Sequence, residues 1–534
     1  MQKVLLAICW GMSLWLTAQT QPFTSNLPLL FIDTEGQAVP DEPKITARLR
    51  IIDNGPGTPN RTSDRANNYD GFIGIELRGS TSQTLFPKKG FGIETRDAEG
   101  NDLDVALLGM PEEEDWVLHG PYSDKSLIRN ALAYTLAGKV MAYAPRVRLV
   151  ELFINNDYRG IYLFTEKIKR DKHRIDISKL SEDENEGDDL TGGYVLKLDK
   201  TTGDDPSVPL FFTSRYGSQI SGGKEVRYLY DYPAPEDITQ PQRLYIQNFI
   251  RDFERSVASR DPDGADSYRD YIDLQSFVDH MLITEIGRNV DGYRLSTWLY
   301  KDKDSRGGRL HMGPVWDYNL AFGNANYCQG ERTQGWAYDF NIVCPDDFWF
   351  VPFWWRELRQ DHVFRNRWRN RWNELRTGPL SDRELERTID SLVAEIGPAA
   401  ERNFRRWPVL DTYIWPNQVV SGSYAAEVDY LRNWLLERVN WMDGNIDFLT
   451  ATPAPAAVGL LQLVPNPTAG RFELWGGPEL RIAETQVYDG AGRRVRVGGP
   501  GQRELDLTGL PGGVYQVMAV TDDRRMLVGR VVLR

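Results

Sequence analysis

The stretch from Asp273 to Asn324 constrains the fold most, because its pattern changes from helix to strand within a short distance. Its first part carries apolar residues at helical spacing behind Asp273, which suits an N-cap. We expect this helix to end near Asn289. Its apolar stripe consists of Phe277, Val278, Met281, Leu282 and Ile286.

Two acidic residues follow this helix at positions where folding does not need an acid. Asp291 lies in the expected turn, and residues 295–300 are β-branched and aromatic enough for a strand. A polar tip at 304–308 turns the chain back into 311–317, so Asp317 ends a second strand. The stretch therefore predicts a helix, an acid in a loop, a hairpin and a second acid.

This order resembles the one in which a protein kinase presents its catalytic base and its metal-binding aspartate. Phosphoryl transfer needs one carboxylate to accept the proton of the attacking hydroxyl and another to hold Mg²⁺ against the phosphates. Asp291 and Asp317 would take these roles. Kinases have a metal-binding Asn five residues after the base, where this chain has Ser296, a weaker magnesium ligand. The alternative is that Asp291 caps a turn and Asp317 pairs with an arginine.

The segment 71–95 predicts two strands around a polar turn. Gly79 and its neighbouring hydroxyl residues can offer backbone N–H groups to a phosphate, and a lysine on the returning strand can reach the phosphate oxygens. The alternative is a solvated hairpin with a chance pair of lysines. The residues that would contact a phosphate or its nucleotide are Arg78, Gly79, Ser80, Lys88 and Lys89.

Two further segments bear on the expected pocket. A helix is predicted from 125 to 140, and its Arg129 and Asn130 are expected to be solvated, the alternative being that they point toward the pocket. A hairpin is predicted over 147–168. Its second strand ends near Glu166, where the backbone can meet an adenine ring.

The formal charge of −13 argues against a general nucleic-acid binder, because that class needs a basic surface. The run 348–376 is rich in Trp and Arg, residues that stack on nucleic acid or glycan. We favour the reading in which the tryptophans pack inside and the arginines pair with nearby acids. Strands with one wet face are expected near 27–32 and 45–52, and further helices over 381–396, 397–407 and 423–448.

The N-terminal residues have the order of a secretory signal peptide. Lys3 precedes an apolar run from Val4 to Leu16 and then small residues, so we expect cleavage after Ala18. This run is too short to span a membrane, and no other segment reaches ~20 apolar residues. The mature chain is therefore expected to leave the cytoplasm without a transmembrane segment.

The chain has three cysteines, and Cys9 falls in the expected signal peptide. The other two, Cys328 and Cys344, bracket a loop after the Asp317 strand and predict one disulfide in an exported protein. A zinc site is not expected, because the five histidines show no metal-ligand spacing.

The end of the chain changes in composition. Residues 449–461 form a Pro/Ala-rich linker, and 462–534 are rich in turns and strands without a long helical pattern. We expect a small all-β sandwich there, with no catalytic cluster. The fold class as a whole is α+β.

Residues from about Leu27 to Phe448 resemble the CotH kinase family of atypical secreted or spore-coat kinases. The resemblance implies a kinase-like two-lobed core over 27–448, with a β-rich N-terminal part and a helical C-terminal part. It carries Asp291 over as catalytic aspartate and Asp317 as metal ligand, with ATP and Mg²⁺ or Mn²⁺ as cofactors. Many members are acidic at the position of Asn319, whose amide oxygen would ligate a metal here. The motifs are LRGSTSQTLFPKKGFGIET, DWVLHGPYSDKSLIRNALAY, ELFINNDYRGIYLFTEKI, GGYVLKLD, NVDGYRLSTWLYKD and GPVWDYNLAFGN.

The last 70 or so residues resemble the C-terminal sorting domain of the type IX secretion system, through PNPTAGRFEL, VYDGAGRRV and LPGGVYQV. This resemblance implies a bacterium of the Bacteroidetes kind. It also implies that the type IX machinery delivers the chain through the periplasm to the cell surface or the medium.

These features favour an exported atypical protein kinase that transfers the γ-phosphoryl group of ATP to Ser or Thr of a protein. The alternative is a cell-surface adhesion or structural protein that keeps a kinase-like fold with weak or no catalysis. A metal-dependent hydrolase would need histidines and clustered carboxylates, which the chain does not show.

Overall fold

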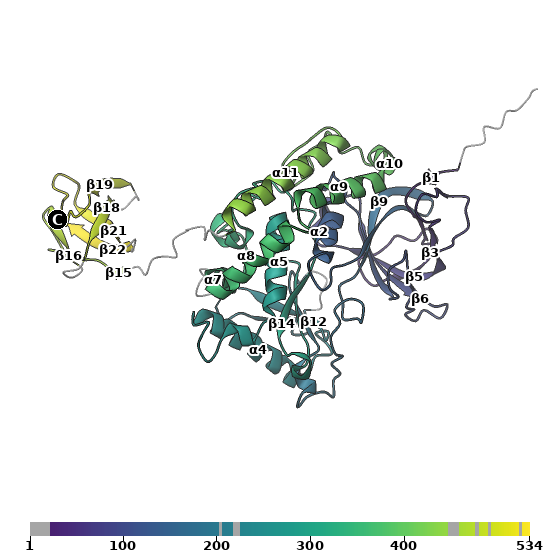
Figure 1. Ribbon diagram of the computed structural model, residues 1–534, viewed down its shortest axis with the longest axis horizontal. Helices are drawn as coiled ribbons and strands as arrows, with labels where there is room; N and C mark the ends of the chain where they lie inside the picture. The colour runs from purple at the N-terminus through teal and green to yellow at the C-terminus, as the bar shows by residue number, and fades with distance from the viewer. Residues whose placement is uncertain are drawn as a thin grey trace, which may run out of the picture. The chain divides into compact units, whose positions relative to one another are not determined.

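The computed structural model describes residues 22–201, 206–216, 225–446, 459–475, 480–489, 493–522 and 526–534. The expected signal peptide and most of the expected linker lie outside these residues. The chain divides into two compact units, Met1–Asp447 and Phe448–Arg534, and both are visible in Figure 1.

A closed seven-stranded barrel forms the N-terminal part of the first unit. In β3 every second residue is buried and the basic residues between are exposed, as predicted for a strand with one wet face. The barrel closes because β2 pairs in parallel with β8, a long-range contact that local periodicity does not predict. In barrel order the strands are β2 (Leu29–Asp33), β3 (Ile45–Ile52), β5 (Tyr69–Arg78), β6 (Gly90–Arg96), β7 (Asp115–His119), β9 (Asp157–Glu166) and β8 (Val147–Ile154).

Short elements decorate the barrel. The polar turn expected after residue 78 contains a five-residue helix, α1 (Thr81–Leu85). A two-stranded sheet pairs β1 (Thr24–Ser25) with β4 (Asn60–Arg61).

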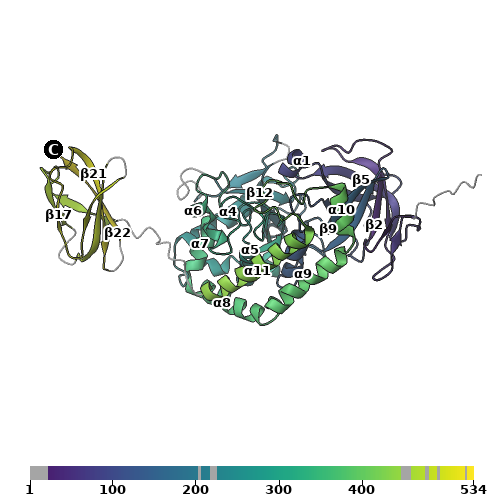
Figure 2. The ribbon, with the colours of Figure 1, turned by 90° about the horizontal axis from the view of Figure 1, so that it is seen from above.

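The rest of the first unit contains a five-stranded sheet and most of the helices. In Figures 1 and 2 the purple barrel strands lie at one end of this unit and helix α7 (Phe353–Gln360) at the other. The α+β class with a sheet-rich N-terminal part is thus confirmed. In order across the sheet the strands are β11 (Phe211–Thr213), β12 (Arg227–Tyr232), β10 (Tyr194–Leu198), β13 (Thr297–Lys301) and β14 (Leu310–Val315).

The helical predictions agree closely with the structure. The remaining helices are α2 (Arg129–Gly138), α4 (Gln240–Ala258), α5 (Leu274–Gly287), α6 (Phe340–Val343), α8 (His362–Arg376), α9 (Asp382–Ile396), α10 (Ala399–Arg406) and α11 (Tyr424–Asn445). The described residues also contain four short 3₁₀ turns, η1 (Asp189–Thr191), η2 (Tyr268–Asp270), η3 (Asp304–Arg306) and η4 (Ala337–Asp339).

The aromatic residues of α7 and α8 pack inside, as predicted. Trp354, Trp355 and Trp368 have no exposed surface. Arg371 pairs with Asp279 at 2.8 Å. These tryptophans are therefore core residues.

The expectation of solvated side chains at the start of α2 was wrong. Arg129 and Asn130 are both buried. Arg129 forms an ion pair with Asp124 at 2.7 Å, which compensates for burying its charge. Asn130 accepts a hydrogen bond from the backbone N–H of Tyr318 at 2.6 Å.

Helix α5 is fixed at its C-terminal turn by a buried carboxylate. Glu285 has no exposed surface and pairs with Arg438 of α11 at 3.1 Å. It also accepts hydrogen bonds from the backbone N–H groups of Ala337 and Tyr338, at 2.7 and 3.0 Å, and from the Tyr293 hydroxyl at 2.9 Å. These bonds join α5 and α11 to the segment before α6 and to the loop that follows α5.

The second unit consists of two sheets that share one apolar cluster, in agreement with the predicted small sandwich. Across the larger sheet the strands are β15 (Gly459–Leu460), β22 (Met526–Leu533), β21 (Gly513–Thr521), β18 (Ile482–Tyr488) and β19 (Arg494–Gly498). Across the smaller they are β16 (Gln462–Val464), β17 (Arg471–Trp475) and β20 (Glu504–Asp506). Within the described parts of the chain, no helix has the length and apolar character needed to cross a membrane.

Replacing Arg438 with methionine should lower the free energy of unfolding by about 3–5 kcal/mol, because it leaves the Glu285 charge buried without its cation. The measurement is urea unfolding followed by tryptophan fluorescence. The control is Arg405→Met, which removes an exposed partner of Glu401 on α10 and should change the same free energy by less than about 1 kcal/mol. Equal effects of the two substitutions would contradict the role given to Glu285.

Candidate active site

One asparagine connects the two segments that carry the predicted acids. Helix α5 ends where Arg288 adopts a left-handed conformation, with φ 42°. The side chain of Asn289 then accepts a hydrogen bond from the Asp291 N–H at 3.2 Å and donates one to the Asp317 carbonyl at 3.2 Å. Asp317 is itself left-handed, with φ 58°. The loop after α5 and the end of β14 are thus held against each other.

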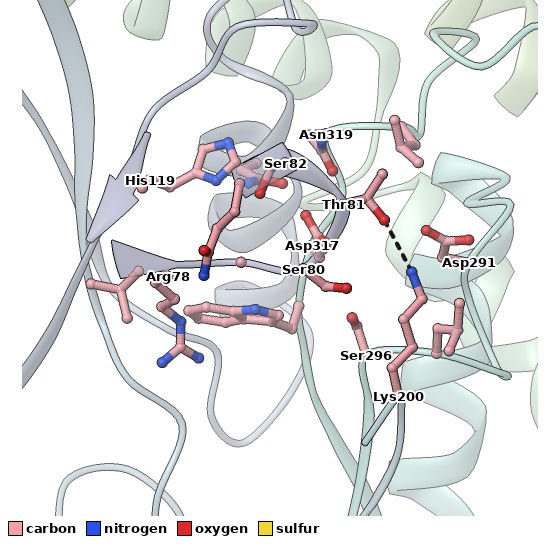
Figure 3. Close-up of a pocket in the computed structure, with 18 of the residues that line it drawn as sticks. Arg78, Ser80, Thr81, Ser82, His119, Lys200, Asp291, Ser296, Asp317 and Asn319 are labelled. Carbon is pink, nitrogen blue, oxygen red and sulfur yellow. Dashed lines mark hydrogen bonds between the residues drawn. The ribbon is translucent and has the colours of Figure 1, made fainter. Parts of the chain in front are cut away.

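Asp291 and Asp317 line the same cavity, which has a volume of about 620 Å³. Figure 3 shows Asp291, Asp317, Ser296 and Lys200 around its interior. The predicted site residues that line the cavity are Arg78, Gly79, Ser80, Lys88, Asp291, Ser296, Asp317 and Asn319. The structure therefore brings together segments that lie far apart in the sequence.

Lys89 and Glu166 are not among the residues that line the cavity. Lys89 donates to the backbone carbonyl of Gln83. Glu166 binds Arg146 at 2.7 Å and accepts a hydrogen bond from the Tyr143 hydroxyl. The Glu166 carboxylate is thus engaged in structural contacts on β9.

Lys88 lines the cavity but its ammonium group is held on the side of α10. It donates to the side chain of Asn403 at 2.8 Å and to the Pro121 carbonyl at 3.3 Å. Burial lowers the pKa of Lys88 well below its usual value, because the charged form loses hydration. A positive charge is therefore disfavoured at this position.

Asp317 titrates unusually. Burial raises its pKa to about 7, and the nearby charges of Asp291 and Asp199 add to the shift, while Lys200 and Arg78 oppose it. No arginine in the described part of the chain lies within ion-pair distance of Asp317, so the alternative in which it pairs with an arginine was wrong. The nearby cations therefore offset only part of the negative charge on the Asp317 carboxylate.

Asp291 is positioned by an arginine that is almost fully buried. Arg294 donates to Asp291 at 3.1 Å and to Asp347 at 2.9 Å, and its side chain is 2% exposed. Burial raises the pKa of Asp291, and Arg294 opposes that shift. The arginine therefore fixes the carboxylate in place while sharing its charge with a second acid.

The second acid lies next to a disulfide bond. Cys328 and Cys344 are joined, with their Cα atoms 5.4 Å apart. The N–H of Asp347 donates to the Cys344 carbonyl at 3.2 Å. The disulfide thus anchors the loop that brings Asp347 to Arg294.

Arg294, Asp347, Asp199 and Lys200 belong to the site but were not identified from the sequence. Asp199 and Lys200 follow β10 and line the cavity. The sequence did contain an indication that Asp199 belongs to the site. The GGYVLKLD motif ends at Asp199, and a strand that ends in an acid is a common pattern at functional sites. Without knowledge that β10 lies beside β13, nothing in the sequence linked this acid to Asp291.

The donor atoms at the cavity suit a hard divalent cation. Asp317 offers a carboxylate, Ser296 a hydroxyl, and Asn319 a buried amide oxygen that has no hydrogen-bond partner in the described part of the chain. Oxygen donors of this kind bind Mg²⁺ or Mn²⁺. Mg²⁺ commonly uses one or two carboxylates together with substrate phosphates, so a complete protein cage is not required.

The family model described as CotH kinase protein matches residues 75–442, which is more than half of the chain. The chain therefore belongs to the CotH kinase family, and a kinase-like function follows from that membership. No curated protein compared with the chain matches it.

Replacing Asp317 with asparagine should stabilise the metal-free protein, increasingly so as the pH rises from about 4 to about 7. The folded protein binds the Asp317 proton more tightly than the unfolded chain, so wild-type stability falls across this window and then levels off. The measurement is the melting temperature in EDTA as a function of pH. Asp183→Asn, at an exposed position, is the control. A wild-type minus Asp317→Asn difference that does not change with pH would contradict the raised pKa.

Proposed function

We propose that this protein transfers the terminal phosphoryl group of ATP to a serine or threonine hydroxyl of a protein. One observation carries the proposal: the α5 loop and the β14 end present Asp291 and Asp317 to one cavity and are joined through Asn289. The cavity volume of about 620 Å³ falls in the range of small-molecule sites. The cavity is lined by residues of the barrel and of the loop after α5, which is consistent with a two-lobed kinase arrangement in which the barrel is one lobe and the α5 region the other.

Asp291 serves as the general base in this proposal. The acceptor hydroxyl oxygen forms a bond to the terminal phosphorus, the bond from that phosphorus to ADP breaks, and the hydroxyl proton passes to the Asp291 carboxylate. Arg294 holds the carboxylate in place through its 3.1 Å ion pair. The raised pKa of Asp291 increases its affinity for the proton.

Asp317 and Asn319 would hold Mg²⁺ or Mn²⁺, with Ser296 as a further oxygen donor. The ion, when bound, would neutralise phosphate charge in the transition state. The raised pKa of Asp317 supports this role, because an added cation relieves the repulsion among Asp317, Asp291 and Asp199.

The adhesion alternative rests on Ser296 and Asn319, which depart from the kinase pattern, and on the aromatic-rich segment 348–376. The second support is weakened, because the tryptophans of α7 and α8 are buried. The cavity, with its unpartnered amide oxygen and unbalanced acids, favours the enzyme.

We also infer that the second unit acts as a type IX sorting domain and that the protein is exported. The support is the resemblance of its PNPTAGRFEL, VYDGAGRRV and LPGGVYQV motifs. A reporter joined to residues 448–534 should reach the surface or medium of a bacterium with this system. Retention of the reporter inside such cells would contradict the inference.

Asp291→Asn should lower kcat by at least about 100-fold while nucleotide binding is retained, because only proton acceptance is lost. Asp317→Asn should weaken Mn²⁺-dependent nucleotide binding as well as transfer. The measurements are transfer of label from terminally labelled ATP and calorimetric titration with a non-hydrolysable ATP analogue, with Asp183→Asn as control. An Asp291→Asn variant that transfers phosphate at the wild-type rate would remove its assignment as base.

A further inference from the structure

The cavity contains several cations, and most of them are already engaged. Arg294 is paired with two aspartates, and Lys197 pairs with Asp231 at 3.3 Å. Arg78 places its guanidinium 5.7 Å from the centre of the Trp316 ring. In Figure 3 the Arg78 guanidinium points away from Asp291 and Asp317. These groups are poorly placed to meet a phosphate between the two acids.

Lys200 differs from these cations in both position and partner. Its ammonium group donates to the Thr81 hydroxyl at 3.3 Å, and no carboxylate in the described residues lies within ion-pair distance of it. Figure 3 shows the side chain crossing the cavity beside Asp291 toward Thr81. Among the cavity cations of the described residues, Lys200 is therefore the one that lies beside Asp291 without a carboxylate at ion-pair distance.

The main chain at Lys200 is anchored close to the proposed base. Asp199 accepts a hydrogen bond from the Lys200 N–H at 2.8 Å, directly after β10 ends. The strand is paired on one side with β13, which follows the Asp291 loop. The Cα atom of Lys200 is thus held next to the sheet strand that follows the loop of the proposed base, Asp291.

We propose that Lys200, and neither Lys88 nor Lys89, is the lysine that binds the transferred phosphoryl group. This proposal rests on the proposed function. A phosphate oxygen forms a charge-assisted hydrogen bond with an ammonium group, which is stronger than the bond to the neutral Thr81 hydroxyl. A bound nucleotide therefore replaces Thr81 as the partner of Lys200. Lys200 then neutralises charge that develops on the phosphoryl oxygens between Asp291 and Asp317.

The lysines expected from the sequence are less suitable on geometric grounds. The Lys88 ammonium is fixed by Asn403 of α10 and the Pro121 carbonyl. Lys89 donates to the Gln83 carbonyl and does not line the cavity. A move of the Lys88 ammonium to the acids would break two buried hydrogen bonds, and a move of Lys89 would break a partly buried one. Lys200 gives up only an exposed hydrogen bond.

The test compares Lys200→Met and Lys200→Arg with the wild-type full chain in the presence of Mn²⁺. Lys200→Met should lower kcat by roughly 100-fold, as removal of one transition-state donor does in other enzymes. It should also weaken ATP binding by about tenfold while AMP binding is unchanged, because only the terminal phosphates are contacted. Lys200→Arg should recover part of both losses. Lys172→Met, which removes an exposed lysine paired with Glu112, is the charge control.

Two further variants separate phosphate binding from a structural contact. Thr81→Val removes the resting partner of Lys200 and keeps the charge, so a purely structural latch predicts that it reproduces the loss seen in Lys200→Met. The proposal predicts that it does not. A loss of ATP preference over AMP in Lys89→Met, with none in Lys200→Met, would overturn the proposal.

The outcome also distinguishes this inference from the proposed function. If the wild-type chain binds ATP but transfers no phosphate, the kinase proposal fails, and the ATP-against-AMP comparison in Lys200→Met still decides the phosphate contact. If the wild-type chain binds no ATP with either Mg²⁺ or Mn²⁺, both proposals are overturned.

Discussion

The buried carboxylate of Glu285 is the interaction on which the catalytic framework depends. A carboxylate without exposed surface is tolerated only when its charge and hydrogen-bonding capacity are satisfied. Here one arginine, two backbone N–H groups and one tyrosine hydroxyl meet that requirement. The donors come from three parts of the chain, namely α11, the turn η4 and the loop after α5, so satisfying Glu285 fixes α5, α11 and the loop that starts at Arg288. Because Tyr293 is one of the donors, the loop that carries Asp291 is fixed by the same carboxylate.

Next to the contacts of Glu285, the cavity carries more negative than positive charge. Arg294 is shared between Asp291 and Asp347, which leaves the acids around the cavity short of positive charge. The raised pKa of Asp317 expresses this shortage, since burial and neighbouring acids disfavour its charged form. A dication with a nucleotide would supply the missing charge, and Lys200 would meet the phosphate that arrives with it. The disulfide beside Asp347 stabilises the outer part of this arrangement.

Local periodicity was enough to predict the elements, but not which of them meet. The α5 helix, its Asp273 cap and the following hairpin were predicted because helix and strand periods and cap chemistry are local properties. Closure of the barrel through β2 and β8 was not predicted, since it depends on a long-range pairing. For the same reason Lys200 was missed. Arg129 was expected in solvent although its partner Asp124 lies only five residues earlier, because the sequence pattern does not show that both side chains are buried together. A polar residue on an amphipathic helix indicates solvent only when no buried partner is available, and the sequence does not show partners.

The central claim is that one cavity brings the metal ligands, the base and the phosphate-binding lysine to the terminal phosphate of ATP. A crystal structure of the full chain with Mn²⁺ and a non-hydrolysable ATP analogue tests it directly, because anomalous scattering locates the manganese. The account predicts a manganese peak bound by Asp317 and Asn319, with the terminal phosphate between Asp291 and the ammonium group of Lys200. A manganese peak at the acidic cluster Glu113, Glu114 and Asp115 instead, or a nucleotide bound outside the cavity, would contradict the account.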